Sequence, residues 1–364
     1  MTTGRYARQT GLIGFGEEAQ RKLAASSVLI IGAGGLGVPA ATYLAAMGVG
    51  RIGIVDDDRV AESNLHRQVA YTPADVGELK VEVLSRRLRA QNPDVQVDAH
   101  ALRLSLEAVP AVAFAEYGLV LDASDNFSTR YLVNDLCVAY GTPLVYGATQ
   151  GFEGQVAVFN LREGSPTYRC LFPESADSDN IPSCAVGGVL GVLPGIIGNL
   201  QALEAVKVLA GVGEPLDGRV YVFDGLAGLH MTLTVGADAA NARISLDELH
   251  QRHAEPRQAS TQALRERLRV GELVIDVRSA AECAADPVPG TNHVPLPSFD
   301  TWLTTYGISL KGDVYFLCAS GKRSLDAARR FNRHTHSARG VSVAGGARAL
   351  WLSAVEEYAR QLSQ

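Results

Sequence analysis

The sequence is poor in cysteine, and its cysteines are widely spaced. The 364 residues include only Cys137, Cys170, Cys184, Cys283 and Cys318, and no two of these form a C-x-x-C pair. An odd number at such spacing excludes a disulfide framework of the kind that staples small secreted domains. Free thiols suit a reducing compartment, so we expect a cytoplasmic protein.

The chain also lacks an apolar leader and an excess of positive charge. Residues 1–8 contain no hydrophobic run, which argues against an export signal. The formal net charge of -6 argues against non-specific binding to nucleic acid. Residues 185–203 are uncharged, but they include Pro194 and several glycines. We interpret them as a glycine-rich loop running into a buried helix, and expect no membrane partner.

A nucleotide-binding pattern is present near the N-terminus. An apolar strand is predicted at 28–31, a helix at 38–47 and a second strand at 52–55. Between the first strand and the helix lie the glycines of a G-x-G-x-x-G motif: Gly32, Gly34 and Gly37. Asp56 ends the second strand, where an acid binds a ribose hydroxyl. The alternative is a glycine-rich turn that only packs.

The rest of the chain alternates between predicted strands and helices. Strands are expected at 95–101, 119–121, 144–146 and 155–159, helices at 15–25, 80–90 and 126–140, and antiparallel strands at 220–223 and 231–235. This order predicts a doubly wound, Rossmann-like mixed α/β sheet over residues 1–235. Composition changes after Val235, so we expect a linker over 236–262. A second, smaller α/β domain is predicted at 263–364.

Charged residues around the glycine motif help to distinguish a dinucleotide site from a triphosphate site. A nicotinamide-dependent oxidoreductase is the first interpretation of Gly32 to Asp56. However, Arg8, Arg67 and Lys80 supply more cations than a dinucleotide needs, and they suit a triphosphate attacked at its α-phosphorus. Asp125 follows a central strand, where a Mg²⁺ ligand is expected. The oxidoreductase remains the alternative.

At this point the sequence resembles the ThiF/MoeB/HesA adenylyltransferases, which are bacterial relatives of ubiquitin-activating enzymes. The matching motifs stand in order over residues 5–235: Arg5-Tyr-Ala-Arg-Gln, Gly32-Ala-Gly-Gly-Leu-Gly, Asp56-Asp-Asp, Ser63-Asn-Leu-His-Arg-Gln, Val76-Gly-Glu-Leu-Lys and Asp122-Ala-Ser-Asp-Asn. The resemblance implies ATP-dependent adenylation of the C-terminal glycine of a small ubiquitin-like sulfur-carrier protein ending in Gly-Gly.

The same resemblance implies a role for each matched residue. Gly34 and Asp56 would hold the nucleotide, Arg67 and Lys80 its phosphates with help from Asn64, and Asp125 the Mg²⁺. Arg8 would reach the active site of the partner subunit in a homodimer.

Cys170 lies where the chain departs from the family pattern, and Cys184 has two possible roles. Many members bind a structural zinc through two C-x-x-C pairs, but here Cys170 has Pro173 in the position of its mate. One thiolate does not make a tetrahedral site, so we expect no structural zinc. Cys184 matches the family's cysteine. It either traps the acyl group or a sulfur, or only packs at a helix start.

The second domain carries a cysteine loop. Cys318 ends a predicted strand at 314–317 and opens Cys-Ala-Ser-Gly-Lys-Arg-Ser before a helix. Backbone N–H groups of such a loop, the helix N-terminus, Lys322 and Arg323 all favour a thiolate. The loop resembles that of a rhodanese (sulfurtransferase) domain over about residues 260–364. That resemblance implies a persulfide on Cys318.

The two resemblances combine into one reaction sequence. The carrier carboxylate attacks MgATP, a Cys318 persulfide loaded from a persulfide or thiosulfate donor attacks the acyl-adenylate, and reduction of the acyl-disulfide, in which Cys184 is a candidate, frees a thiocarboxylate. Besides the oxidoreductase, the alternative is a non-catalytic scaffold that only docks the carrier. An intact Cys318 loop speaks against the scaffold, since docking needs no thiolate.

Overall fold

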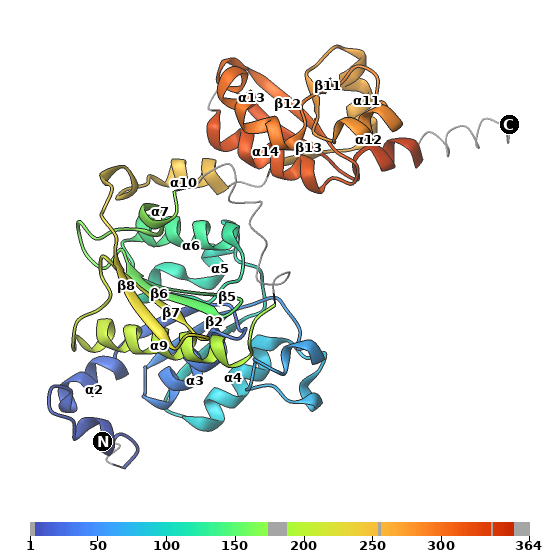
Figure 1. The fold of residues 1–364 in the computed structure, drawn as a ribbon. Coiled ribbons are helices and arrows are strands. Elements are labelled where there is room, and N and C mark those ends of the chain that lie inside the picture. The colour runs from blue at the N-terminus through green and yellow to red at the C-terminus, as the bar shows by residue number, and fades with distance from the viewer. Residues whose placement is uncertain (1–3, 174–187, 254–255, 336–337, 353–364) are drawn as a thin grey trace. The chain divides into compact units, whose positions relative to one another are not determined.

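The computed structural model describes residues 4–173, 188–253, 256–335 and 338–352. The chain divides into two compact units, Met1–Leu246 and Asp247–Gln364 (Figure 1). Each unit has its own sheet and its own hydrophobic core.

The first unit is built on an eight-stranded mixed sheet. Its strand order is β3-β2-β1-β4-β5-β6-β7-β8, and the first five strands are parallel. The strands are β1 (Ser27–Ile31), β2 (Arg51–Val55), β3 (Gln96–His100), β4 (Leu119–Asp122), β5 (Leu144–Gln150), β6 (Glu153–Phe159), β7 (Arg219–Asp224) and β8 (Leu229–Thr234). The last three strands add antiparallel pairs. The predicted doubly wound mixed α/β fold is therefore confirmed.

Helices cover both faces of this sheet. The helical segments are α1 (Ala7–Thr10), α2 (Gly16–Ala24), α3 (Gly37–Ala46), η1 (Glu62–Asn64), η2 (Pro73–Asp75), α4 (Lys80–Gln91), α5 (Val109–Val112), η3 (Phe114–Glu116), α6 (Phe127–Tyr140), α7 (Tyr168–Leu171) and α9 (Val192–Ala210). In Figure 1, α3, α4 and α9 lie on one side of the sheet and α5 and α6 on the other. Both faces of β1, β2 and β4 are buried, as their continuous apolar runs require, whereas β3 at the edge of the sheet is only partly buried.

One described helix, α9, is long and apolar enough to span a membrane. Half of its most apolar stretch is nevertheless buried in the first unit, and Gly198 lies so close to α3 that an added Cβ would be 2.3 Å from the Leu36 carbonyl oxygen. Its buried polar residue Gln201 donates to the Asp122 carbonyl at 2.7 Å. These contacts confirm the predicted buried helix.

The second unit is a five-stranded parallel sheet in the order β11-β10-β12-β13-β9. Its strands are β9 (Arg257–Ala259), β10 (Val274–Asp276), β11 (Asn292–His293), β12 (Gly312–Leu317) and β13 (Ala338–Val343). The first unit ends with η5 (Ala239–Asn241), and α10 (Leu246–His253) follows at the boundary between the units. The other helical segments of the second unit are α11 (Thr261–Arg269), α12 (Ala280–Ala285), η6 (Leu296–Ser298), α13 (Phe299–Tyr306), η7 (Gly307–Ser309) and α14 (Lys322–His334). Separate apolar clusters fill the two faces of the sheet. The stretch expected as a linker thus contributes β9 to this sheet.

Candidate functional site

The turn after β1 needs glycine at two positions. Gly32 has φ of +105°, and an added Cβ would lie 2.7 Å from the Ala123 carbonyl oxygen. At Gly37 an added Cβ would lie 1.9 Å from the Gly32 carbonyl oxygen. These contacts hold β1, β4 and α3 close together. At Gly34, by contrast, an added Cβ would meet only the Gln68 side chain, at 3.7 Å, so this backbone is open to a ligand.

A cavity of about 450 Å³ lies over the carboxyl ends of β1, β2 and β4. It brings together every residue that the sequence assigned to the nucleotide: Gly34, Asp56, Asn64, Arg67, Lys80 and Asp125. This is the edge at which doubly wound sheets bind ligands. Arg8 is not among the lining residues and is exposed on α1. Its predicted role toward a partner subunit stays a prediction.

Asp56 is held firmly at the end of β2. Its two carboxylate oxygens accept the backbone N–H groups of Ala33, at 2.7 Å, and Asp58, at 2.8 Å. Burial raises the pKa of Asp56, although the Lys80 charge and the two N–H groups oppose the rise. The carboxylate therefore has a fixed orientation at the cavity wall, as an acceptor for a sugar hydroxyl requires.

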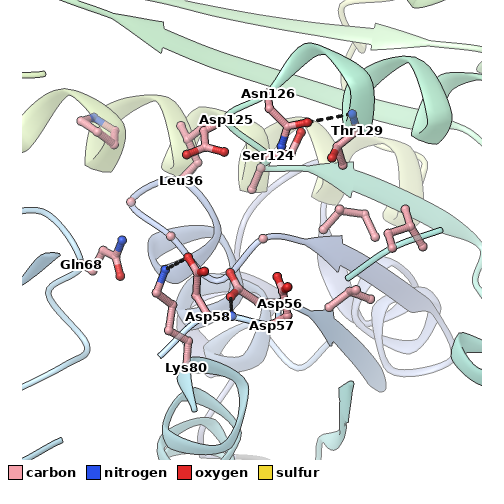
Figure 2. A pocket seen from close by; sticks show the side chains of 18 of the residues that line it. Leu36, Asp56, Asp57, Asp58, Gln68, Lys80, Ser124, Asp125, Asn126 and Thr129 are labelled. Carbon is pink, nitrogen blue, oxygen red and sulfur yellow. Dashed lines mark hydrogen bonds and ion pairs between the residues drawn. The ribbon is translucent and has the colours of Figure 1, made fainter. Parts of the chain in front are cut away.

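Lys80 enters the cavity from the start of α4. Its ammonium group donates to Asp58 at 2.7 Å, and the Lys80 side chain is only 6% exposed whereas that of Asp58 is 67% exposed (Figure 2). Asn64 accepts the Ala61 N–H at 3.2 Å and so closes the turn that carries Arg67. Arg67 donates to the Ser63 carbonyl at 3.0 Å. Two cations are thus fixed beside the glycine turn, where phosphates bind.

Asp125 lies across the cavity from Lys80, on the loop after β4 (Figure 2). It makes no hydrogen bond or ion pair with the part of the chain that the structure describes, so its oxygens are available to a cation. The next residue, Asn126, caps α6 by accepting the Thr129 N–H at 2.9 Å.

The chemistry of the donor set therefore fits Mg²⁺ at Asp125. Its carboxylate oxygens are hard ligands, which this ion prefers. The neighbouring carboxylates of Asp56 and Asp58 are less available, because Asp56 holds two backbone N–H groups and Asp58 pairs with Lys80.

The structure adds cavity residues that the sequence interpretation missed. Arg103 and Leu104 come from the loop after β3, and Thr149 comes from β5. Arg130 comes from the first turn of α6, where it donates to the Ser124 carbonyl at 3.2 Å and lies over the Tyr146 ring. Of these residues, only Arg130 could have been found from the sequence. It is four residues after the predicted cap, Asn126, so it lies on the same side of the helix at its start.

Cys318 directly follows β12, and the loop that it opens donates hydrogen bonds to its sulfur. Its sulfur accepts the Gly321 N–H at 3.1 Å and lies 3.5 Å from the Ser324 hydroxyl. Burial raises the pKa of Cys318, but hydrogen bonds from the Ser324 hydroxyl and from backbone N–H groups of Ser324, Ser320 and Gly321 outweigh it and lower the pKa below the ordinary thiol value. The loop therefore favours the thiolate, as predicted.

The two cations of this loop, Lys322 and Arg323, have different surroundings. Arg323 forms a two-point ion pair with Glu282 of α12, at 2.8 and 2.5 Å, so its charge is largely neutralised there. Lys322 is exposed. Hydrogen bonds to the sulfur therefore do more to stabilise the thiolate than the Arg323 charge that the sequence suggested.

The remaining cysteine predictions concern Cys170 and Cys184. The Cys170 sulfur accepts backbone N–H groups of Thr167, at 3.4 Å, and Asp238, at 3.3 Å. Among the described residues, the metal-ligating side chains that gather in threes are Asp56, Asp57 and Asp58, and not cysteines. The described residues around Cys170 thus supply a single thiolate, which does not by itself make a tetrahedral zinc site. Cys184 lies outside the described residues.

The fold resembles that of enzymes of known structure. Escherichia coli MccB, crystallised with ATP, aligns with a TM-score of 0.57 at 22% identity, over 65% of this chain and 73% of that chain. At this identity the likeness shows the fold alone.

Sequence comparisons give closer relatives. The chain is 52% identical to a sulfur carrier protein adenylyltransferase of Thermus thermophilus, over 64% of this chain and 86% of the relative. It is 37% identical to the adenylyltransferase and sulfurtransferase MOCS3 of Drosophila yakuba, over 97% of this chain and 83% of the relative. A family model described as ThiF family matches residues 6–243. The chain therefore belongs to the ThiF family.

Proposed function

We propose that this protein adenylates the C-terminal glycine of a small ubiquitin-like sulfur-carrier protein and then transfers sulfur to it. The observation that carries the proposal is the gathering of six motif residues in one cavity, together with a separate thiolate loop at Cys318. One relative named for adenylation supports it, as does another that is named for both activities and matches along almost the whole chain. The family match favours this chemistry over a nicotinamide-dependent oxidoreductase.

The first step is a displacement at the α-phosphorus of ATP. A carboxylate oxygen of the carrier forms the new P–O bond, and the bond to the leaving pyrophosphate breaks. Arg67 and Lys80 counter the charge of the phosphates, and Asp56 orients the ribose. Mg²⁺ held by Asp125 would neutralise phosphate charge when bound.

The second step uses sulfur carried on Cys318. The outer sulfur of its persulfide attacks the acyl carbon, the acyl C–O bond breaks, and AMP leaves with the electron pair. The product is an acyl disulfide. A thiolate, for which Cys184 is the candidate within this chain, then attacks the Cys318 sulfur and releases the carrier as a thiocarboxylate. The new disulfide at Cys318 is reopened by a thiol reductant.

We propose an adenylating domain at 1–235 and a rhodanese-like sulfurtransferase domain at 263–364, to whose sheet β9 of the preceding stretch is added. We further propose a cytoplasmic homodimer in which Arg8 completes the partner's site. A persulfide or thiosulfate donor would load Cys318. We propose no structural zinc, because Cys170 has no second cysteine at Pro173.

The test is ATP–pyrophosphate exchange with a carrier ending in Gly-Gly. Exchange should appear only when the carrier is present. Asp125→Ala should remove most of it, because the metal would lose its protein ligand. Asp94→Asn, at an exposed acid outside the cavity, is the control and should exchange normally. Normal exchange by Asp125→Ala would refute the metal assignment, and no exchange by the wild-type protein would refute the adenylation.

A further inference from the structure

Ser342 is a buried hydroxyl in an otherwise apolar part of β13. Its residue is 2% exposed, and its neighbours Val341 and Val343 are also buried. The strand register places Ser342 beside Phe316, two residues before Cys318. A hydroxyl in such surroundings costs free energy unless it is hydrogen-bonded, so its partner is informative. Ser342 lies outside the cysteine loop that the sequence analysis identified.

The partner of Ser342 is the serine that touches the reactive sulfur. The Ser342 and Ser324 hydroxyl oxygens are 3.0 Å apart. Ser324 is fully buried, donates to the Gly321 carbonyl at 3.0 Å and lies 3.5 Å from the Cys318 sulfur. A chain of contacts therefore runs from β13 through α14 to Cys318.

The number of protons on these groups decides what the chain can do. Ser324 has one hydroxyl proton and three possible acceptors, the Gly321 carbonyl, the Cys318 sulfur and the Ser342 hydroxyl. Among the described residues the Ser342 hydroxyl has Ser324 as its hydrogen-bond partner, so a Ser342 proton donated to Ser324 leaves the Ser324 proton to the other two acceptors. With a neutral thiol, Cys318 donates to Ser324, and Ser324 donates to Gly321. With a thiolate, Ser324 turns its proton to the sulfur. In both states the Ser324 oxygen has a lone pair that can accept a hydrogen bond from the Ser342 hydroxyl.

We propose that Ser342 is a positioning residue for Cys318: by donating to Ser324 in both states, it keeps the single Ser324 proton for the sulfur. A hydroxyl that accepts a hydrogen bond becomes a stronger donor, so Ser342 would strengthen the Ser324 bond to the anion. The relevance to sulfur transfer rests on the proposed function, but the hydrogen-bond role does not.

Charged groups around the sulfur come from other elements. Glu282 of α12 pairs with Arg323 of α14, and Asp276 of β10 pairs with Arg278 at 2.6 Å. Cys283 of α12 interacts with Asp276, and burial, the largest cause, raises its pKa. Lys322 and Arg348 are exposed at the loop. None of these groups contacts Ser342, so its replacement leaves them unchanged.

The experiment measures the thiolate of Cys318 directly. Ultraviolet thiolate absorbance of the full chain is titrated with pH, and the titration of the matching Cys318→Ala protein is subtracted. Ser342→Ala should move the midpoint upward by about half a pH unit, which means about threefold less thiolate below the midpoint. Ser324→Ala should move it by about one unit, the value of one hydrogen bond.

Three further variants separate this role from a structural one. Ser342→Thr keeps the hydroxyl and should restore the wild-type midpoint. Adding Ser342→Ala to Ser324→Ala should cause no additional shift, because Ser342 acts through Ser324. Thr335→Val removes another buried hydroxyl of this unit, one that donates to the Phe331 and Ala338 carbonyls, and should leave the midpoint unchanged.

An unchanged midpoint in Ser342→Ala would overturn the proposal. It would also be overturned if Ser342→Ala caused the same shift in the wild-type protein as in the Ser324→Ala protein. Sulfur loading of Cys318 is measured separately by mass spectrometry. If the midpoint shifts but the wild-type protein accepts no sulfur, the proposed function fails and the role of Ser342 stands.

Discussion

At the scale of single residues, the two sites use charge in different ways. Lys80 is buried beside Asp58 and presents one ammonium group to the cavity, where a triphosphate needs a fixed cation. At Cys318, the Arg323 guanidinium of the loop is held by Glu282, and hydrogen bonds stabilise the sulfur. Glu282 therefore does more for the shape of the loop than for the charge on the thiolate.

This arrangement predicts a pH dependence for the second unit. The Arg323 guanidinium, with the Ser279 N–H and hydroxyl, lowers the pKa of Glu282 far below its ordinary value. A folded-state pKa below the unfolded one gives stability that is present above the ordinary carboxyl pKa and is lost as pH falls through and below it. Glu282→Gln should therefore be less stable at neutral pH, by up to about 1 kcal/mol because both partners are partly exposed. The difference should begin to shrink as pH falls to the ordinary carboxyl pKa of about 4 and should go on shrinking at lower pH.

Tryptophan fluorescence can measure this, since both tryptophans, Trp302 and Trp351, lie in the second unit. Denaturant unfolding of the full chain is followed at several pH values. Glu272→Gln is the control, because Glu272 pairs with Arg267 in the same unit at 2.7 Å but touches neither Arg323 nor Cys318. A pH-independent difference between Glu282→Gln and wild type would contradict the assigned role.

At the scale of elements, the start of α6 connects stability with catalysis. Asn126 caps this helix, and Asp125 immediately precedes the cap. Loss of an N-cap costs about 1 kcal/mol and lets the first turn fray. Asn126→Ala should therefore lower the stability of the first unit by about that amount and also raise the Mg²⁺ concentration needed for pyrophosphate exchange.

Circular dichroism during unfolding and a magnesium titration of exchange test the two effects together. Asn126→Ser keeps a capping oxygen and should restore both values. If Asn126→Ala lost stability but needed no more Mg²⁺, Asp125 would not depend on the cap for its position.

At the scale of the whole molecule, what the sequence could predict was local. Gly32, Gly37 and Asp56 belong to one strand–helix–strand segment, so their spacing alone indicates their roles. The Cys318 loop is likewise contiguous, because one strand end and one helix start carry all of its parts. Each motif could therefore be interpreted without knowing the order of the strands.

Residues brought in by distant elements could not be predicted in this way. Arg103 reaches the cavity only because β3 lies beside β2, and Ser342 reaches Ser324 only because β13 pairs with β12 in one register. Gln201 contacts the backbone of β4 across a long separation in sequence. Strand order and register decide these contacts, and nothing in the local pattern of residues encodes them.

The most direct test of the central claim, that adenylation and sulfur transfer use different residues of one chain, is a pair of assays on Cys318→Ala. Pyrophosphate exchange and thiocarboxylate formation on the carrier, with a persulfide donor, are measured on the same full-length protein. Because alanine keeps the loop N–H groups and removes only the nucleophile, exchange should equal that of the wild type and thiocarboxylate should be lost. Arg67→Ala, the converse variant, should weaken exchange but still load sulfur on Cys318. Thiocarboxylate formed by Cys318→Ala at the wild-type rate would contradict the account and make Cys184 the candidate for the sulfur relay.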